Sequence, residues 1–383
     1  MIDRYCRLKE RERFGWAPLF VVVSDDGCMI PVNVVFSPDW WNRRFGVSFE
    51  EPFYLDLETR IANDLLMRRV LYELFGIGTP DLKPRPVIGS RHIAGGFVLP
   101  ALLGVQIRFT AGQAAWPIPR NLDRDSAMEL RAPDVTNTWP MNALTAQMEI
   151  LERRFGHVTG DFNTGGLVND AVELRGNNLF CDLKEDPELT DHLFAVIAET
   201  IVTLSRYIRR RTGTTSIAVN RSILSVDSSI HLTSNCSVSM IAPTLYESRI
   251  LPYEMQVAKE LAPFGIHHCG GNLQKYADQY NQVDPKFLDV GFGSDLEKCS
   301  RLFPSAFLNL RMSPVHLLEL SESQVYSEVW DALKACGRTA QVGVCCINMD
   351  GMTPDRNVTA MFQAVSDFEA GTRRPAGGGR TES

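Results

Sequence analysis

The stretch Gly265-Ile266-His267-His268-Cys269-Gly270-Gly271 predicts the end of a buried strand. An apolar run leads into it, and two glycines follow, which allow the backbone to turn sharply. Residues i and i+2 of a strand project from the same face, so His267 and Cys269 point one way and His268 the other. Imidazole and thiolate are good ligands for zinc. The stretch therefore predicts a strand that ends in two candidate metal ligands.

Helix-like and strand-like segments alternate on both sides of this stretch. Helical periodicity predicts helices over 141–154, over 243–262, and from an Asp186 N-cap to Gly213. Short apolar segments predict strands at 216–219 or 223–226, 287–290, 306–310 and 341–347. Such alternation is typical of parallel βα units, and about eight units fit in a chain of 383 residues. We therefore predict an α/β fold, a (β/α)8 TIM barrel with an N-terminal helical and hairpin extension, in preference to a doubly wound sheet.

The predicted domain is a single barrel over residues 1–370. Residues 85–140 are rich in glycine and proline and lack a regular pattern, which indicates an irregular insertion or a lid. Residues 371–383 indicate a flexible tail. The sequence has neither a Gly-x-Gly-x-x-Gly motif after a strand nor a Gly-x-x-x-x-Gly-Lys-Ser/Thr motif, so a nucleotide-binding fold has no support.

Composition narrows the class of protein. A hydrophobic content of 44% and a charged content of 22% are typical of a soluble globular enzyme. A net charge of −7 and a pI near 5.6 argue against binding to nucleic acid or to an anionic membrane. Nine scattered cysteines without a secretory leader indicate reduced thiols, and no uninterrupted apolar run approaches the length of a membrane span. We expect a cytoplasmic protein.

Polar residues follow most of the predicted strands. In a barrel of parallel strands the active site lies at the carboxyl ends of the strands. The strand ends supply candidate catalytic carboxylates at Asp161, Asp227 and Asp289, although polar residues at strand ends are common in any protein. They also supply four candidate substrate-binding residues: Asp25, Asn163, Asn235 and Arg311. Asp26 adjoins the first of these, Asp25.

A third metal ligand is sought among the later cysteines. Cys345 and Cys346 lie on the last predicted strand and face opposite ways, so at most one of them binds a metal. With His267 and Cys269, one of them would complete a His-Cys-Cys zinc site with an open fourth position, as in catalytic zinc sites. The alternative is that these cysteines are small buried hydrophobic residues. Whether Cys236 approaches the metal stays open.

Several segments between residues 140 and 370 resemble the uroporphyrinogen decarboxylase superfamily, whose members are (β/α)8 barrels. The similar segments are Asn177–Pro187, Pro252-Tyr253, Gly265–Gly271, Asp289–Asp295 and Thr353–Val358. The decarboxylases proper carry arginines on an N-terminal strand, where they grip substrate propionates. Here the segment Phe20–Cys28 has no arginine, and Asp25 and Asp26 would repel a polycarboxylate.

The sequence is more similar to the methylcobamide:thiol methyltransferases, the coenzyme M-type branch of this superfamily. They bind zinc through His-x-Cys and a later cysteine, which match His267, Cys269 and, with one residue of offset, Cys346. With two residues of offset the later cysteine would be Cys345. The resemblance implies that zinc activates a thiol for methyl transfer to or from a corrinoid. Asp227 or Asp289 would orient His267, unless they only cap helices.

The resemblance also implies partners. The chain has no Asp-x-His-x-x-Gly motif, so the corrinoid would be carried by a separate protein that docks over the barrel mouth. Trp116 and Trp139 could contribute to that surface, or to the core or a homodimer interface. The small-molecule partner would be a methyl donor or a thiol acceptor. The alternative functions are a metal-independent lyase acting on a tetrapyrrole or other polycarboxylate, and a non-enzymatic member that keeps the barrel.

Overall fold

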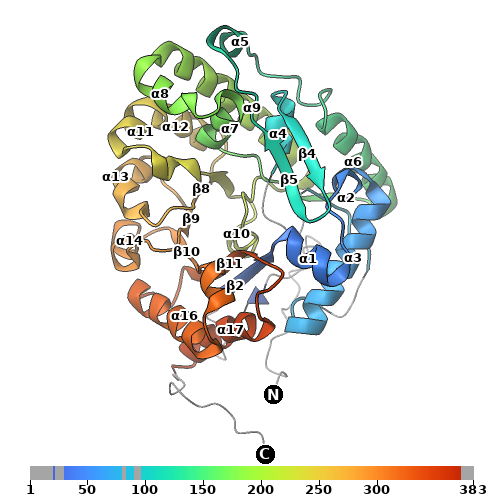
Figure 1. The fold of residues 1–383 in the computed structure, drawn as a ribbon, viewed down its shortest axis with the longest axis vertical. Helices are drawn as coiled ribbons and strands as arrows, with labels where there is room; N and C mark the ends of the chain where they lie inside the picture. The colour runs from blue at the N-terminus through green and yellow to red at the C-terminus, as the bar shows by residue number, and fades with distance from the viewer. Residues whose placement is uncertain (1–19, 22–29, 80–82, 90–95, 372–383) are drawn as a thin grey trace, which may run out of the picture.

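The computed structural model describes residues 20–21, 30–79, 83–89 and 96–371. The candidate residue Asp25, its neighbour Asp26 and the predicted tail beyond Gly371 lie outside the described residues. Figure 1 shows strands in the interior and helices around them, which is an α/β architecture. Among the described residues, no helix is both long and apolar enough to cross a membrane.

The central sheet has seven strands in the order β1-β2-β11-β10-β9-β8-β7. All neighbouring pairs from β2 to β7 are parallel, and only β1 is antiparallel to its neighbour β2. The predicted parallel βα units are therefore confirmed for six strands. Their bounds are β1 Phe20–Val21, β2 Pro31–Phe36, β7 His231–Ser234, β8 Phe264–His268, β9 Phe287–Val290, β10 Phe307–Arg311 and β11 Val342–Met349.

Two further pairs of strands lie beside this sheet. β3 (Val87–Gly89) pairs in parallel with β6 (Thr159–Asp161). Single parallel bridges, Phe162 to Ser216 and Ile217 to Leu232, connect the end of β6 to β7, so the sheet curls onward past β7. Within the predicted insertion, β4 (Gln106–Thr110) and β5 (Gln113–Ile118) form an antiparallel hairpin.

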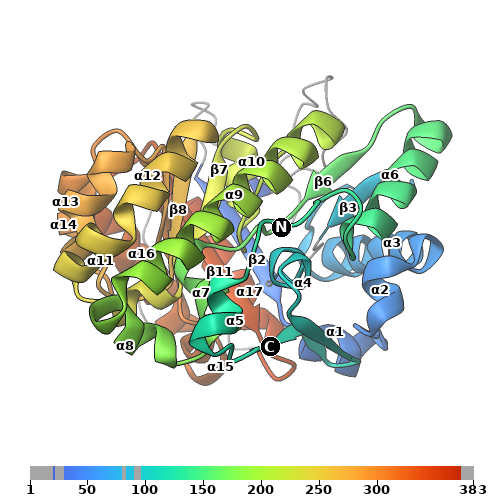
Figure 2. The same cartoon turned by 90° about the horizontal axis from the view of Figure 1, so that it is seen from above.

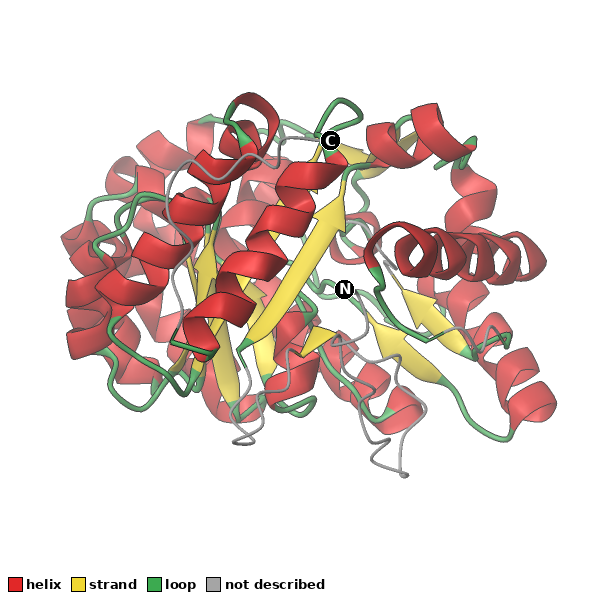
Figure 3. Ribbon diagram, turned by 90° about the horizontal axis from the view of Figure 1, so that it is seen from below, coloured by secondary structure: helices red, strands yellow, loops and turns green. Residues whose placement is uncertain are grey.

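The helices pack around the curled sheet, as Figures 2 and 3 show. The longest is α9, which begins after the Asp186 N-cap and ends at Gly213 in the left-handed region, as the sequence predicts. The predicted helix over 243–262 is divided at Ile250 into two helices. The helices before α10 are α1 Pro38–Phe45, α2 Glu51–Leu55, α3 Leu57–Phe75, α4 Val98–Leu102, α5 Arg124–Met128, α6 Met141–Phe155, α7 Leu167–Arg175, α8 Asn178–Glu185 and α9 Pro187–Thr212. The later helices are α10 Ser222–Val226, α11 Pro243–Arg249, α12 Leu251–Glu260, α13 Ala277–Tyr280, α14 Leu296–Leu302, α15 Pro314–Glu319, α16 Glu322–Cys336 and α17 Asp355–Glu369, with 3-10 turns η1 Ser237–Met240, η2 Leu273–Tyr276 and η3 Asn281–Val283.

Candidate metal centre

The carboxyl end of β8 is enclosed by the ends of its two neighbours. All five residues of β8 are buried, and its register pairs Ser234 of β7 with His267. After β8 the chain turns at Gly270 and Gly271, where the backbone passes very close to the loop that follows β9. A Cβ atom on Gly271 would lie 2.7 Å from the Phe292 carbonyl oxygen, so only glycine fits there.

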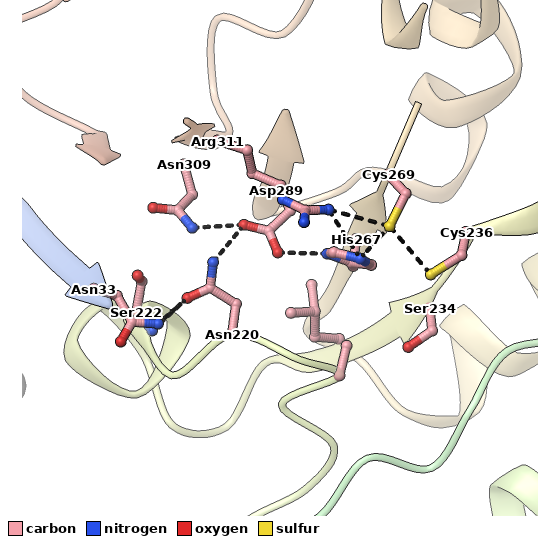
Figure 4. Close-up of polar contacts among 12 residues, drawn as sticks. Asn33, Asn220, Ser222, Ser234, Cys236, His267, Cys269, Asp289, Asn309 and Arg311 are labelled. Atoms are coloured by element: carbon pink, nitrogen blue, oxygen red, sulfur yellow. Dashed lines mark hydrogen bonds and ion pairs between the residues drawn. The ribbon is translucent and has the colours of Figure 1, made fainter. Parts of the chain in front are cut away.

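Three side chains converge at this end of the sheet, as Figure 4 shows. His267 Nε2 lies 3.0 Å from Cys269 Sγ, and Cys269 Sγ lies 3.3 Å from Cys236 Sγ. Their ligand atoms lie within 4.8 Å of one another. Among the described residues, these three side chains form the cluster of potential ligands that could hold a metal ion. His268 turns the other way, to Tyr280 and Asn272.

The third member of this cluster is Cys236, and not Cys346 as the sequence predicted. Both Cys345 and Cys346 are fully buried on β11, which β9 and β10 separate from β8. Cys345 pairs with Arg311 in the sheet, and Cys346 packs into the hydrophobic core. Cys236, two residues beyond β7, takes the third place because its Sγ lies 3.3 Å from Cys269 Sγ, whereas Cys346 packs into the core.

Asp289 of β9 fixes the imidazole ring of His267. His267 Nδ1 and Asp289 Oδ2 are 2.6 Å apart, and both side chains are fully buried. The other carboxylate oxygen accepts hydrogen bonds from Asn220 and Asn309 at 2.8 and 2.5 Å. Because Nδ1 donates to the carboxylate, Nε2 faces Cys269, which is the orientation that a metal ligand needs.

Asp227 does not contact His267, and the prediction that it orients the ring is wrong. Residues 222–226 form the helix α10 rather than a strand, so Asp227 precedes β7 and lies at the opposite edge of the sheet. It is exposed, and its carboxylate accepts hydrogen bonds from the backbone and hydroxyl of Ser229 at 2.8 and 2.6 Å. It therefore closes a local turn.

The cluster is strongly polarised. The hydrogen bond between Cys236 and Cys269, together with the charges of His267 and Arg311, lowers the pKa of Cys269 to about 2 against the effect of burial. The same hydrogen bond and burial raise the pKa of Cys236. Burial lowers the pKa of His267, but the Cys269 charge and the Asp289 hydrogen bond outweigh it and raise this pKa to about 9. Cys269 is thus a thiolate, and it lies between a protonated Cys236 and a protonated His267.

Arg311 brings a guanidinium to the same point from the end of β10. Its Nη1 lies 3.1 Å from Cys269 Sγ and 3.4 Å from His267 Nε2. Burial lowers the pKa of Arg311, but the charges of Cys269, Cys345 and Asp289 raise it overall, so this side chain is always a cation. It can bind an anionic group that approaches the cluster.

The remaining predicted residues lie around β6 and β7. Asn163 accepts a hydrogen bond from the Ser234 hydroxyl at 3.2 Å, and Asn235 donates to Glu254 at 2.7 Å. Asp161 forms an ion pair of 3.1 Å with Arg221. No pattern in the sequence pointed to Asn220 or Asn309, since a buried amide leaves no periodic signal in a single sequence. The same holds for Asn169, which binds the segment that carries Cys236.

Comparison with known proteins gives a shared fold. No family model matches the sequence, and no curated protein sequence matches it. A solved structure described as a methyltransferase from Methanosarcina mazei superposes with a TM-score of 0.63 and 15% identity, covering 88% of this chain and 94% of that chain. A B12-independent methionine synthase from Shewanella sp. W3-18-1 in complex with selenomethionine superposes with a TM-score of 0.44 and 11% identity, covering 88% and 96%. The first shows the fold of this chain, and the second is too distant to add to it.

Proposed function

We propose that this protein is a zinc-dependent methyltransferase of the corrinoid type. The observation that carries the proposal is the convergence of Cys236, His267 and Cys269 at the carboxyl ends of parallel strands. The shared fold with a methyltransferase from Methanosarcina mazei supports it, as does the resemblance of the His267-x-Cys269 stretch. We further propose that residues 1–370 form one domain whose curled sheet closes into a (β/α)8 barrel, and that the protein is cytoplasmic.

The donor set fits zinc. Once a metal displaces the protons of Cys236 and His267, two thiolates and one neutral imidazole are a common set of three protein ligands, and three ligands leave one position for a substrate. Thiolates favour zinc over magnesium or calcium. The carboxylate of Asp289, which accepts from Nδ1, keeps Nε2 of His267 turned to the two sulfurs.

When bound, zinc would hold a small-molecule thiol as a thiolate near neutral pH, or activate a methyl donor, for methyl transfer to or from a corrinoid. The residues of the chain bind the substrate and orient the metal ligands. Asp289 holds the His267 ring, and Arg311 supplies a buried cation beside Cys269. Asp161 remains a proposed catalytic carboxylate, and Asp25, Asn163 and Asn235 remain proposed contacts of the substrate.

A separate corrinoid protein is the proposed partner, and exposed apolar side chains that follow the strands are its proposed contacts. Four exposed apolar side chains follow four strands at the same edge of the sheet as the metal centre: Met240 after β7, Phe292 after β9, Val315 after β10 and Met352 after β11. Apolar patches with polar surroundings often mark protein interaction sites. Trp116 of the β4–β5 hairpin is also exposed.

Metal analysis of purified variants tests the site. We expect about one zinc per chain in the wild type, and almost none in Cys236→Ser or Cys269→Ser. Cys346→Ser is the matched control and should keep its zinc, because this cysteine packs in the core. Circular dichroism would check that each variant is folded. A zinc-free wild type, or equal zinc loss in the Cys346 variant, would contradict the proposal.

Activity is measured separately. Methylcobalamin is mixed with a panel of small thiols, and the absorbance change of the corrinoid reports demethylation. We expect turnover that needs zinc and is lost in Cys269→Ser. Decarboxylation of a tetrapyrrole polycarboxylate by the metal-free protein would instead favour the lyase function.

A further inference from the structure

The segment Ser234–Ser237 carries Cys236 between the end of β7 and the 3-10 turn η1. Its two end groups are both bound by one side chain. Asn169 Nδ2 donates to the Ser234 carbonyl at 2.9 Å, and the Ser237 N–H donates to Asn169 Oδ1 at 2.9 Å. These are the carbonyl and N–H groups that a four-residue turn would otherwise join to each other. The amide of Asn169 therefore bridges the turn.

We propose that Asn169 is a positioning residue for Cys236. The planar amide holds its donor and acceptor at a fixed separation, so both ends of the segment are set at once. Asparagine alone suits this bridge, because aspartate lacks the donor and glutamine is longer by one methylene. Metal ligands must lie within about 0.2 Å of their proper distances, so small movements of Cys236 matter.

Asn169 can act in this way because its own backbone is fixed against β7. The loop before α7 touches the strand directly: the Ser234 N–H donates to the Gly165 carbonyl at 3.0 Å. A Cβ atom on Gly166 would lie 2.1 Å from the Ser234 carbonyl oxygen, so the two backbones are in direct contact. The start of α7 and the end of β7 therefore move as one unit.

A second set of bonds holds the segment from the side of β8. The Asn235 N–H donates to the His267 carbonyl at 2.8 Å, and Asn235 Nδ2 donates to Glu254 at 2.7 Å. These bonds fix the residue before Cys236, whereas Asn169 fixes the residues on both sides of it. The loss of Asn169 would remove its bonds to Ser234 and Ser237 and leave the bonds of Asn235 to His267 and Glu254.

The effect on metal binding rests on the proposed function, and zinc affinity measured by competition with a chromophoric chelator tests it. In Asn169→Asp and Asn169→Ala we expect zinc to bind 10- to 100-fold more weakly, the usual effect of losing a partner of a metal ligand. Cobalt(II) substitution should show weakened thiolate-to-metal absorption. The matched control is Asn357→Asp, since Asn357 also donates to two backbone carbonyls, Leu317 at 2.9 Å and Leu320 at 2.7 Å, and neither belongs to the segment that carries Cys236.

A readout without metal separates this inference from the proposed function. Hydrogen peroxide is added to metal-free protein, and peptide mapping follows a Cys236–Cys269 disulfide. The two thiols give up two electrons and two protons, the S–S bond forms, and peroxide is reduced to two waters. The sulfurs are 3.3 Å apart in the wild type, so we expect fast closure there and in Asn357→Asp, and closure at least several-fold slower in the Asn169 variants.

The two readouts decide the matter together. Slower closure in the Asn169 variants alone supports the positioning role even if the wild type binds no zinc, in which case only the proposed function fails. Unchanged closure in both Asn169 variants would overturn the inference. So would equal losses of zinc affinity and closure in Asn357→Asp, because the effect would then follow general stability.

Discussion

The His267 ring is held by a buried carboxylate that is itself fully hydrogen-bonded. Asp289 accepts from Asn220 and Asn309 through one oxygen and from His267 through the other. Asn33 extends this chain of amides to β2, because its Nδ2 donates to Asn220 at 2.6 Å. A buried charge is tolerated only where donors replace water, and these amides do so. The network thus sets the place and the orientation of the imidazole.

We predict that Asp289→Asn weakens zinc binding. The variant replaces the negative acceptor of the Nδ1 proton with a neutral amide, so the ring is held less firmly and is a weaker base. Zinc affinity should fall 10- to 100-fold, as measured by chelator competition. Asp161→Asn is the control, because Asp161 pairs with Arg221 outside the ligand cluster. An equal fall in both variants would show that the effect is not specific to the network.

Helix α12 places an ionisable group behind the centre. Glu254 is buried, and its Oε1 accepts from Asn235 at 2.7 Å. Burial raises the pKa of Glu254 from 4.5 to about 7. The folded protein therefore holds this proton more tightly than the unfolded chain does. The resulting stabilisation is fully present below pH 4.5 and is lost as the pH rises through about 7.

Glu254→Gln should remove this pH dependence, since glutamine keeps the acceptor oxygen and never ionises. Between pH 4.5 and 8 the wild type should lose about 3 kcal/mol of unfolding free energy that the variant keeps. Urea unfolding at several pH values measures it. Glu260→Gln, on the exposed end of the same helix, serves as the control and should follow the wild type. Parallel curves for wild type and Glu254→Gln would contradict the prediction.

The central sheet brings together early and late segments of the described chain. β11 pairs with β2, so the last strand lies beside one of the first described ones, and Arg44 of α1 pairs with Asp355 of α17 at 2.6 Å. The metal centre depends on this global fold, because its ligands come from two separate βα units. An unfolded chain would not hold the three ligand atoms together.

Zinc should therefore stabilise the folded state as a whole. At a free concentration 100 times its Kd, zinc adds about 2.7 kcal/mol to the free energy of unfolding. Thermal or urea unfolding with zinc, and with a chelator, measures the difference. Cys236→Ser should lose this dependence, and magnesium should not replace zinc because the centre has thiolate ligands. Equal stabilisation of the Cys236 variant by zinc would place the metal elsewhere.

Several local features of the protein can be predicted from its sequence alone. The period of two along a strand places His267 and Cys269 on one side, and the N-cap Asp186 and Gly213 bound α9. The alternation of apolar segments predicted parallel βα units, which the six strands confirm. These features depend on residues near one another in the chain, so their signals are visible in a single sequence.

Which distant residues meet depends on the tertiary structure. Cys236 rather than Cys346 joins the cluster, because the loop after β7 brings the Cys236 sulfur to Cys269, whereas Cys346 packs into the hydrophobic core. Asp289 rather than Asp227 orients the imidazole, because residues 222–226 form a helix and leave Asp227 at the far edge. The order of strands across a sheet is set by long-range packing. Spacing along the chain carries no direct record of it.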